Sequence, residues 1–259
     1  MVNFAETWHI PAIFAMGIFA GCINTLAGGG SLITLPVLIL FGLPANIANG
    51  TNRLAITVQS IFAVAGFMKK GISNYRFSIL ISAPTLGGTL VGAQLAVDIS
   101  DILFKKILAG TMLFVLGIIL LNPLLKKRND AILRSIINSD IRRHAVIMTI
   151  FFFIGVYGGF IQAGIGFILI AALTSLCGLN LVETNSQKVF TVGISSFLAV
   201  TIFIIHNNIC WTMGLALAAG NGLGGWIGSH LAVTRGERFI QYILTICIIA
   251  LSAKLLYNG

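Results

Sequence analysis

The sequence predicts an all-α integral membrane protein made of two inverted-topology repeats of about five helical segments each. Three observations predict this fold: a very apolar composition, long runs without charge, and a polar pattern that occurs twice. Of the 259 residues, 57% are hydrophobic and only 9% are charged, and the mean hydropathy is +0.99. A soluble domain of this size cannot bury that much apolar surface, whereas bilayer helices require it.

Two long runs of the chain carry almost no charge. Residues 145–182 carry no formal charge, and residues 189–234 carry only His206 and His230. Each run is long enough for two bilayer helices of about 20 residues. The first apolar stretch, 8–26, lacks a basic leader and carries the start of the repeat, so we interpret it as a permanent helix rather than a signal peptide.

The polar pattern recurs 138 residues further on with every gap preserved: Gly17, Gly21, Asn24 and Gly28 recur as Gly155, Gly159, Gln162 and Gly166. A second pattern, Thr51-Asn52-Arg53, recurs as Ser186-Gln187-Lys188. Membrane proteins built from two copies of one bundle usually hold a substrate site between the copies, near the bilayer midplane. The duplication therefore indicates a transporter.

Apolar periodicity and turn residues predict five helical segments in each half. They fall at about 8–27, 31–44, 47–68, 76–97 and 103–125, then at about 144–164, 166–180, 184–205, 211–233 and 237–257. The domains are thus a first repeat over 1–125, a linker over 126–143 and a second repeat over 144–259. Glycine-rich joints precede the second segment of each repeat, which we expect to be short or interrupted. The sequence leaves open whether the first two segments of each repeat span fully or form re-entrant hairpins.

Basic residues are distributed unequally between the two sides that these segments define. One side has 12 Lys and Arg residues, and the other has 4, namely Arg53, Lys105, Lys106 and Lys254. The positive-inside rule then puts the basic loops in the cytoplasm and both termini in the periplasm or outside the cell. Five segments per half reverse the second copy, so the repeat is inverted. We expect a multi-pass protein of the cell's inner membrane.

The linker 126–143 has an apolar stripe at helical spacing, formed by Ile132, Leu133, Ile136, Ile137 and Ile141, opposite its basic residues. Asn129 or Asp130 is a suitable N-cap. We interpret the linker as a basic amphipathic helix on the anionic inner leaflet, which makes the lipid bilayer a partner of this segment. A regulatory or lipid-sensing element is the alternative.

The candidate substrate site combines glycine-rich helix ends with amides, hydroxyls and cations. A break at residues 28–31 exposes backbone N–H groups at the start of a half-helix, an arrangement that suits an oxyanion. Amides such as Asn24 and Gln162 are costly in hydrocarbon unless they bond each other, a broken helix end or a ligand. The predicted substrate-binding residues are Asn24, Gly28, Gly29, Gly30, Ser31, Thr51, Asn52, Arg53, Gln162, Gly166, Ser186, Gln187 and Lys188.

Simpler interpretations exist for parts of this pattern. The glycines alone fit close helix packing of the GxxxG kind. Arg53 and Lys188 could extend along apolar surface to the membrane interface as anchors. Because one cation stands at the matching place in each copy, we instead expect them to guard the outer and inner approaches to a central site.

Several functions lack the residues that they need. Six of the seven carboxylates lie in predicted loops or ends, and only Glu183 is near the proposed site, so an anion is a better cargo than a cation. The four cysteines are scattered singly, and no metal-ligand spacing occurs. We find no catalytic triad, P-loop or dinucleotide fingerprint, and expect no enzyme activity, cofactor or metal. The net charge of +9 has a topological explanation and does not indicate nucleic-acid binding.

Two long stretches resemble the TauE/SafE family of sulfite exporter-like permeases: residues 20–32 with Pro36, and residues 48–54. Residues 228–232 and 252–257 resemble the closing segments of that family. The resemblance covers nearly the whole chain. It implies a bacterial or archaeal inner-membrane carrier for sulfite, sulfonates or related sulfur-containing or organic anions.

The function predicted from the sequence is secondary transport of such a small anion by alternating access. A passive anion channel is the alternative within transport. An intramembrane enzyme would need a titratable pair at interfacial depth, and a membrane scaffold would not need the duplicated polar triplets. The sequence does not fix the anion, the direction, the coupling ion or whether the chain forms a homo-oligomer.

Overall fold

The computed structural model describes residues 9–72, 74–97, 99–111 and 141–258, and these residues form α-helices joined by short turns, with no strand among them. The first half contains α1 (His9–Leu26), α2 (Ser31–Leu40), α3 (Ala45–Lys69) and α4 (Tyr75–Val97), followed by a helical stretch at 101–111. The second half contains α7 (Ile141–Phe160), α8 (Ile165–Cys177), α9 (Leu181–Ile205) and α10 (Trp211–Asn258). The all-helical prediction is confirmed.

The predicted segments match these helices to within a few residues at most ends. Segment 31–44 stops early, at Leu40, because Gly42 adopts a φ of 87° and Pro44 follows. Segments 211–233 and 237–257 form α10, whose helical backbone is interrupted at Gly236 with φ 69° and ψ −165°. Residues 112–125 of the fifth segment and most of the linker 126–143, including its proposed N-cap, lie outside the described residues.

Helix lengths agree with a membrane protein whose second helices are short. Three described helical spans are long and apolar enough to cross a bilayer: His9–Leu26, Arg76–Val97 and Leu181–Ile205. In contrast, α2 has 10 residues and α8 has 13. At about 1.5 Å per residue, neither reaches across a hydrocarbon core of about 30 Å. The prediction of a short second segment in each half is confirmed.

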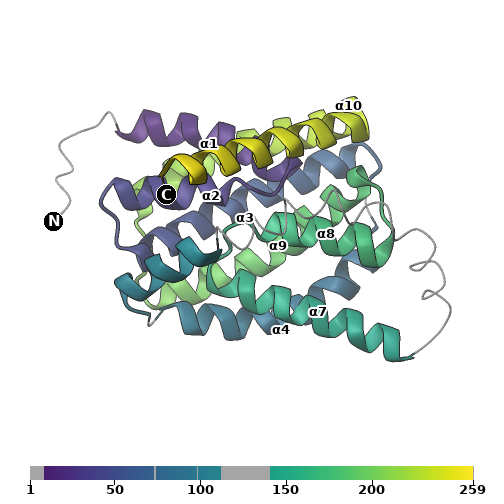
Figure 1. Cartoon of the computed structure of the whole chain (residues 1–259), viewed down its shortest axis with the longest axis horizontal. Coiled ribbons are helices and arrows are strands. Elements are labelled where there is room, and N and C mark those ends of the chain that lie inside the picture. Colours follow the sequence, from purple (N-terminus) through teal and green to yellow (C-terminus); the bar gives the residue numbers. More distant parts are fainter. Residues whose placement is uncertain (1–8, 73, 98, 112–140, 259) are drawn as a thin grey trace.

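Helices of the first half pack against helices of the second half (Figure 1). α1 lies against α10 along one edge, α4 lies against α7 along the opposite edge, and α3 and α9 pack against each other between them. The edge contacts are close because small residues face them: a Cβ on Gly17 or Gly21 would overlap the α10 backbone, and one on Gly155 or Gly159 would overlap the α4 backbone. The GxxxG interpretation is therefore right for these four glycines.

α3 and α9 run in opposite directions. The start of α3 lies beside the end of α9, where Gly50 contacts Phe203 and Asn46 donates to the Asn208 Oδ1 at 3.4 Å. The end of α3 lies beside the start of α9, where the Ser186 hydroxyl donates to the Ile72 carbonyl at 2.7 Å. An inverted repeat requires this antiparallel pairing, and the placement of each half in a membrane stays a prediction.

Candidate functional site

Both halves have the same break between their first and second helices. α1 ends at Leu26 and α2 begins at Ser31, while α7 ends at Phe160 and α8 begins at Ile165, so four residues intervene in each case. The break includes a residue of positive φ in each half, Gly28 at 85° and Gln162 at 63°. Positive φ is uncommon for a residue with a side chain and often marks a functional site.

These breaks change the residue pairing that the sequence pattern predicts. When the two breaks are aligned on their helix ends, Leu26 pairs with Phe160 and Gly28 pairs with Gln162. The repeated sequence pattern instead pairs Asn24 with Gln162, so the two alignments differ by four residues. In this second alignment, on the helix ends, Gly21 still meets Gly155 and Gly30 meets Gly164, but Gly17 meets Phe151 and Gly28 meets Gln162, so most of the glycine match is lost. Asn24 lies in the last turn of α1, whereas Gln162 lies in the break after α7.

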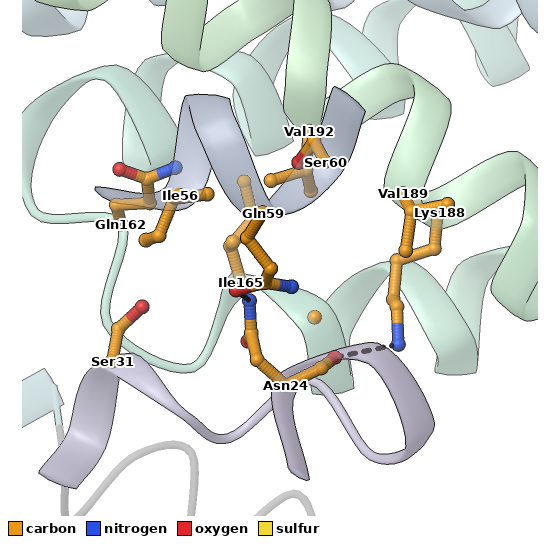
Figure 2. Close-up of a pocket in the computed structure, with 11 residues that line it drawn as sticks. Asn24, Ser31, Ile56, Gln59, Ser60, Gln162, Ile165, Lys188, Val189 and Val192 are labelled. Atoms are coloured by element: carbon orange, nitrogen blue, oxygen red, sulfur yellow. Dashed lines mark hydrogen bonds between the residues drawn. The ribbon is translucent and has the colours of Figure 1, made fainter. Parts of the chain in front are cut away.

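A small cavity lies between the two halves, where the breaks meet α3 and α9 (Figure 2). The space open to the centre of a water-sized sphere is about 10 Å³, close to the minimum for one water molecule. Its lining comes from both halves: Asn24, Ser31, Ile56, Gln59, Ser60, Gln162, Ile165, Gly166, Lys188, Val189 and Val192. The first residues of both short helices, Ser31 and Ile165, are among them.

The short helices begin at this cavity without a capping side chain. The N-cap residues are Gly30 and Gly164, which offer no side-chain acceptor to the first turn. The start of a helix carries a partial positive charge and N–H groups that lack an intrahelical acceptor. Two helix starts that converge on one polar space therefore favour an anion there.

One wall of the cavity carries an ordered relay of amides. The Asn24 Nδ2 donates to the Gln59 Oε1 at 3.0 Å, and the Gln59 Nε2 donates to the Thr25 Oγ1 at 3.2 Å. The Thr25 hydroxyl in turn donates to the Gly21 carbonyl at 2.9 Å. The relay fixes the orientation of the Asn24 and Gln59 side chains before any ligand arrives.

Two buried polar atoms of cavity-lining residues have no hydrogen-bond partner among the described residues: the Ser60 Oγ and the Gln162 Oε1. Ser60 and Gln162 are 2% and 3% exposed. The other polar atom of the Gln162 amide, Nε2, is occupied, because it donates to the Ser196 hydroxyl. A buried polar atom without a partner costs about 1–3 kcal/mol, so atoms like these indicate a ligand or an ordered water.

The Lys188 ammonium group stands at the edge of the cavity and is bonded to three oxygen atoms. It donates to the Asn24 carbonyl at 3.0 Å, the Thr25 carbonyl at 2.8 Å and the Asn185 Oδ1 at 2.6 Å. Figure 2 shows its Nζ directed at the last turn of α1. A cation in that position is stabilised by the partial negative charge of the helix end.

The Arg53 guanidinium occupies the matching place at the end of α7. Its Nη2 donates to the Gly159 carbonyl at 2.5 Å, and its Cζ lies 5.1 Å from the centre of the Phe203 ring. Gly159 corresponds to Thr25 when the breaks are superposed, so both cations bond equivalent carbonyls of the opposite half. Lys188 lines the cavity and Arg53 does not. Both are 1–2% exposed, so neither is an anchor that reaches the membrane surface.

Only part of the predicted substrate-binding set lines the cavity, namely Asn24, Ser31, Gln162, Gly166 and Lys188. The others make structural contacts. The Thr51 hydroxyl accepts from the Cys210 N–H, the Asn52 Oδ1 accepts from the Thr34 hydroxyl, Ser186 bonds Ile72, and Gln187 accepts from Ser78. Gly28 packs on the Gly166 backbone, Gly29 on the Phe167 ring, and Gly30 on Ala20 and Asn24.

The sequence reasoning missed Gln59 and Ser60, which line the cavity from α3. The signal was available, because a glutamine and a serine lie side by side within the apolar run after Arg53. It also missed Asn185, which holds Lys188. Ile56, Ile165, Val189 and Val192 give no chemical signal, since apolar residues are common throughout the chain.

The described cavity lining contains one cation and no carboxylate. In the described part of the chain, no group of three or more His, Cys, Asp and Glu residues is arranged to hold a metal ion. The groups that line the cavity can form hydrogen bonds and present one positive charge.

Residues 13–255 match the protein family described as Sulfite exporter TauE/SafE. A "Probable membrane transporter protein" of Haemophilus influenzae is 30% identical over 257 residues, which cover 96% of this chain and 95% of that protein. The "Probable membrane transporter protein YfcA" of Escherichia coli K12 is 28% identical over 253 residues, covering 96% and 90%. The "Probable membrane transporter protein YjnA" of Bacillus subtilis is 26% identical over 261 residues, covering 95% and 99%. No solved structure matches the chain.

Proposed function

The chain belongs to the TauE/SafE family, and from that premise we propose that it is a secondary carrier of a small anion across the cell's inner membrane. The cargo is sulfite, a sulfonate or a related sulfur-containing or organic anion. It binds in the cavity between the two halves, and the protein works by alternating access.

The observation that carries this proposal is the pair of unpartnered polar atoms, the Ser60 Oγ and the Gln162 Oε1, in a cavity enclosed by both halves. An oxyanion oxygen accepts from the Ser60 hydroxyl and lies near the two helix starts. The Lys188 charge favours an anion over a cation or a neutral solute.

The position of the cavity supports a carrier. When α3 and α9 are aligned from their first residues, Ile56 corresponds to Val192. Ser31 and Ile165 also correspond, because they are the first residues of α2 and α8. Both members of each pair line the cavity. A site bounded by equivalent residues of two halves can open toward either side by equivalent movements. The cavity has room for about one water molecule, so in this proposal it widens by a movement of the two halves when an anion binds.

The experiment is flux into proteoliposomes, with sulfite, thiosulfate, sulfonates and carboxylates as a panel. A carrier gives saturable uptake of labelled anion that is accelerated by unlabelled anion inside the vesicle, because the loaded carrier returns faster than the empty one. A channel also lets the label exchange, but without this acceleration. Uptake of none of the panel overturns the anion assignment.

The variant Gln162→Met removes the polar atoms of the side chain and keeps its approximate volume. We expect it to reduce flux about tenfold or more while the protein still inserts, because the change removes a ligand contact rather than a core side chain. The matched control is Gln94→Met, an exposed glutamine on α4, which should keep wild-type flux. Equal flux in the two variants would remove Gln162 from the site.

A further inference from the structure

Lys188 and Arg53 differ in whether their charged group borders the cavity. They are the two charged side chains that are buried within the described residues. The Lys188 charge borders the cavity, whereas the Arg53 guanidinium lies between the Gly159 carbonyl and the Phe203 ring and is not part of the lining. The central site therefore contains one cation rather than two.

We propose that Lys188 is a specificity-determining residue that sets the charge of the cargo at minus one, so that the site carries a monovalent oxyanion and rejects its divalent form. This proposal rests on the proposed function. For sulfite, whose second ionisation lies near neutral pH, the transported species is then hydrogensulfite.

Lys188 acts through its charge and not as a direct hydrogen-bond donor to the cargo. An ammonium group has three hydrogens, and three oxygen atoms accept them at 2.6–3.0 Å. The donors that remain for an anion are neutral: the Ser60 hydroxyl, and those N–H groups in the first turns of α2 and α8 that do not already donate to a nearby carbonyl, as the Leu32, Ile33 and Phe167 N–H groups do. The cargo thus contacts neutral groups and senses Lys188 over a longer distance.

The charges around the cavity balance a single negative charge. The end of α1 carries about half a negative charge, which faces the Lys188 ammonium group, and the start of α2 carries about half a positive charge, which faces the cavity, so the two contributions add no net charge although the start of α2 still attracts an anion locally. The partial charges of α7 and α8 offset in the same way, and the Arg53 guanidinium at the end of α7 lies outside the lining, against the Gly159 carbonyl and the Phe203 ring. The ammonium group of Lys188 remains, and no carboxylate faces it from the described lining. A divalent anion would leave one uncompensated charge in a buried site, which is strongly unfavourable.

The first measurement compares two anions in wild-type proteoliposomes as pH is varied. Methanesulfonate stays monovalent throughout, so it corrects for any titration of the protein itself. We expect the ratio of sulfite flux to methanesulfonate flux to fall with rising pH, in proportion to the remaining hydrogensulfite. A ratio that stays level or rises with pH overturns the proposal, because the divalent form is then carried.

The second measurement separates the charge of Lys188 from its hydrogen bonds. Lys188→Gln keeps amide hydrogens for the α1 carbonyls and removes the charge, and Lys188→Arg keeps the charge. We expect half-saturation by methanesulfonate to weaken about tenfold to a hundredfold in Lys188→Gln and about threefold or less in Lys188→Arg. Arg53→Gln should lower folded yield or maximal flux and leave half-saturation and the pH ratio unchanged. Unchanged half-saturation in Lys188→Gln overturns the proposal.

Thermal stabilisation of the purified protein by methanesulfonate tests charge sensing without transport. Wild type should be stabilised and Lys188→Gln should not. If vesicles admit no anion but this difference is found, the proposed function is wrong and the charge assignment stands. If transport occurs and both proteins are stabilised equally, the proposed function stands and the charge assignment is wrong.

Discussion

Asn49 and Asn185 make the same hydrogen bond from opposite halves of the protein. The Asn49 Nδ2 donates to the Phe160 carbonyl at 2.9 Å, and the Asn185 Nδ2 donates to the Leu26 carbonyl at 2.9 Å. Phe160 and Leu26 are the last residues of α7 and α1. Each third helix therefore holds the end of the first helix of the other half, just before the chain breaks toward the cavity.

We expect both Asn49→Leu and Asn185→Leu to destabilise the protein, because each leaves a buried carbonyl at a helix end without its partner, and Asn185→Leu to do so more, because Asn185 also accepts from Lys188 while the Asn49 Oδ1 has no partner. The cost of such a loss is about 1–3 kcal/mol. Thermal unfolding in detergent measures it as a lower Tm for both variants. Thr149→Val is the control, since the exposed Thr149 bonds only the Ala145 carbonyl of its own helix. A melting temperature that falls in one variant alone would contradict the equivalence of the two bonds.

The fold was predictable from the sequence because long apolar runs and glycine joints are local signals. Helix positions, the short α2 and α8, and the breaks before them all follow from residue type. The register between the repeats was not, since the glycine pattern favours one alignment and the helix ends at the two breaks correspond in another, four residues away. Structural contacts such as the Asn49 bond distinguish them, and these depend on tertiary packing.

The candidate site was predictable in part. Asn24, Gln162 and Lys188 stand out as polar residues in apolar sequence, and all three reach the cavity. Thr51, Asn52, Ser186 and Gln187 stand out equally but turn to neighbouring helices, because successive side chains on a helix point about 100° apart. A repeated polar triplet therefore identifies a buried helix and does not tell which of its residues faces the site.

The contact between Gly28 and Gly166 predicts a graded series of alanine variants. Gly28→Ala should lower Tm and folded yield most, since it combines a φ of 85° with overlap on the Gly166 backbone. Gly166→Ala suffers the overlap alone. Gly71 has a φ of 72° but no neighbour within 4 Å, so Gly71→Ala should lower the stability only by the backbone strain that alanine introduces there, about 1–2 kcal/mol. Gly110→Ala, in a helix with free space, should be neutral or stabilising. An equal effect of Gly71→Ala and Gly28→Ala would show that packing of the two breaks is unimportant.

The bond from Asn24 to Gln59 predicts that Asn24→Leu abolishes transport while the protein still inserts. The change removes an amide from the cavity and leaves the Gln59 Oε1 without its donor. Flux in proteoliposomes and the elution profile of the purified protein separate loss of transport from loss of folding. Thr174→Val, on α8 and bonded within its own helix, serves as control. Wild-type flux in Asn24→Leu would reduce this part of the repeat to helix packing.

The partly exposed Asp101, just before the predicted segment 103–125, gives a pH-dependent contact. Its pKa lies below its ordinary value because Lys105 donates to the carboxylate, and because the Ala45 N–H donates to its Oδ1 at 2.5 Å. A lowered pKa adds stability above the ordinary carboxyl range, and this stability is lost as pH falls through the folded-state value. We expect wild type to melt above Asp101→Asn near neutral pH and the two to converge in acid. A constant difference between their melting temperatures would contradict this.

The antiparallel pairing of α3 and α9 gives the sharpest test of the inverted repeat. Lys70 and His206 are the residues that follow α3 and α9, and they are exposed at opposite ends of the bundle. The excess of basic residues predicts that Lys70 is cytoplasmic and His206 periplasmic, so Lys70→Cys should resist a membrane-impermeant maleimide in intact cells while His206→Cys reacts. Both substitutions are made in a background without Cys22, Cys177, Cys210 and Cys247. Lys69, which lies 4.8 Å from the centre of the Trp226 ring, suits an anchor at the inner interface.

Reaction of both Lys70→Cys and His206→Cys from outside would exclude a membrane-spanning inverted repeat. Reaction at Lys70→Cys alone would be consistent with the repeat but would reverse the predicted orientation of the protein in the membrane, with both termini in the cytoplasm.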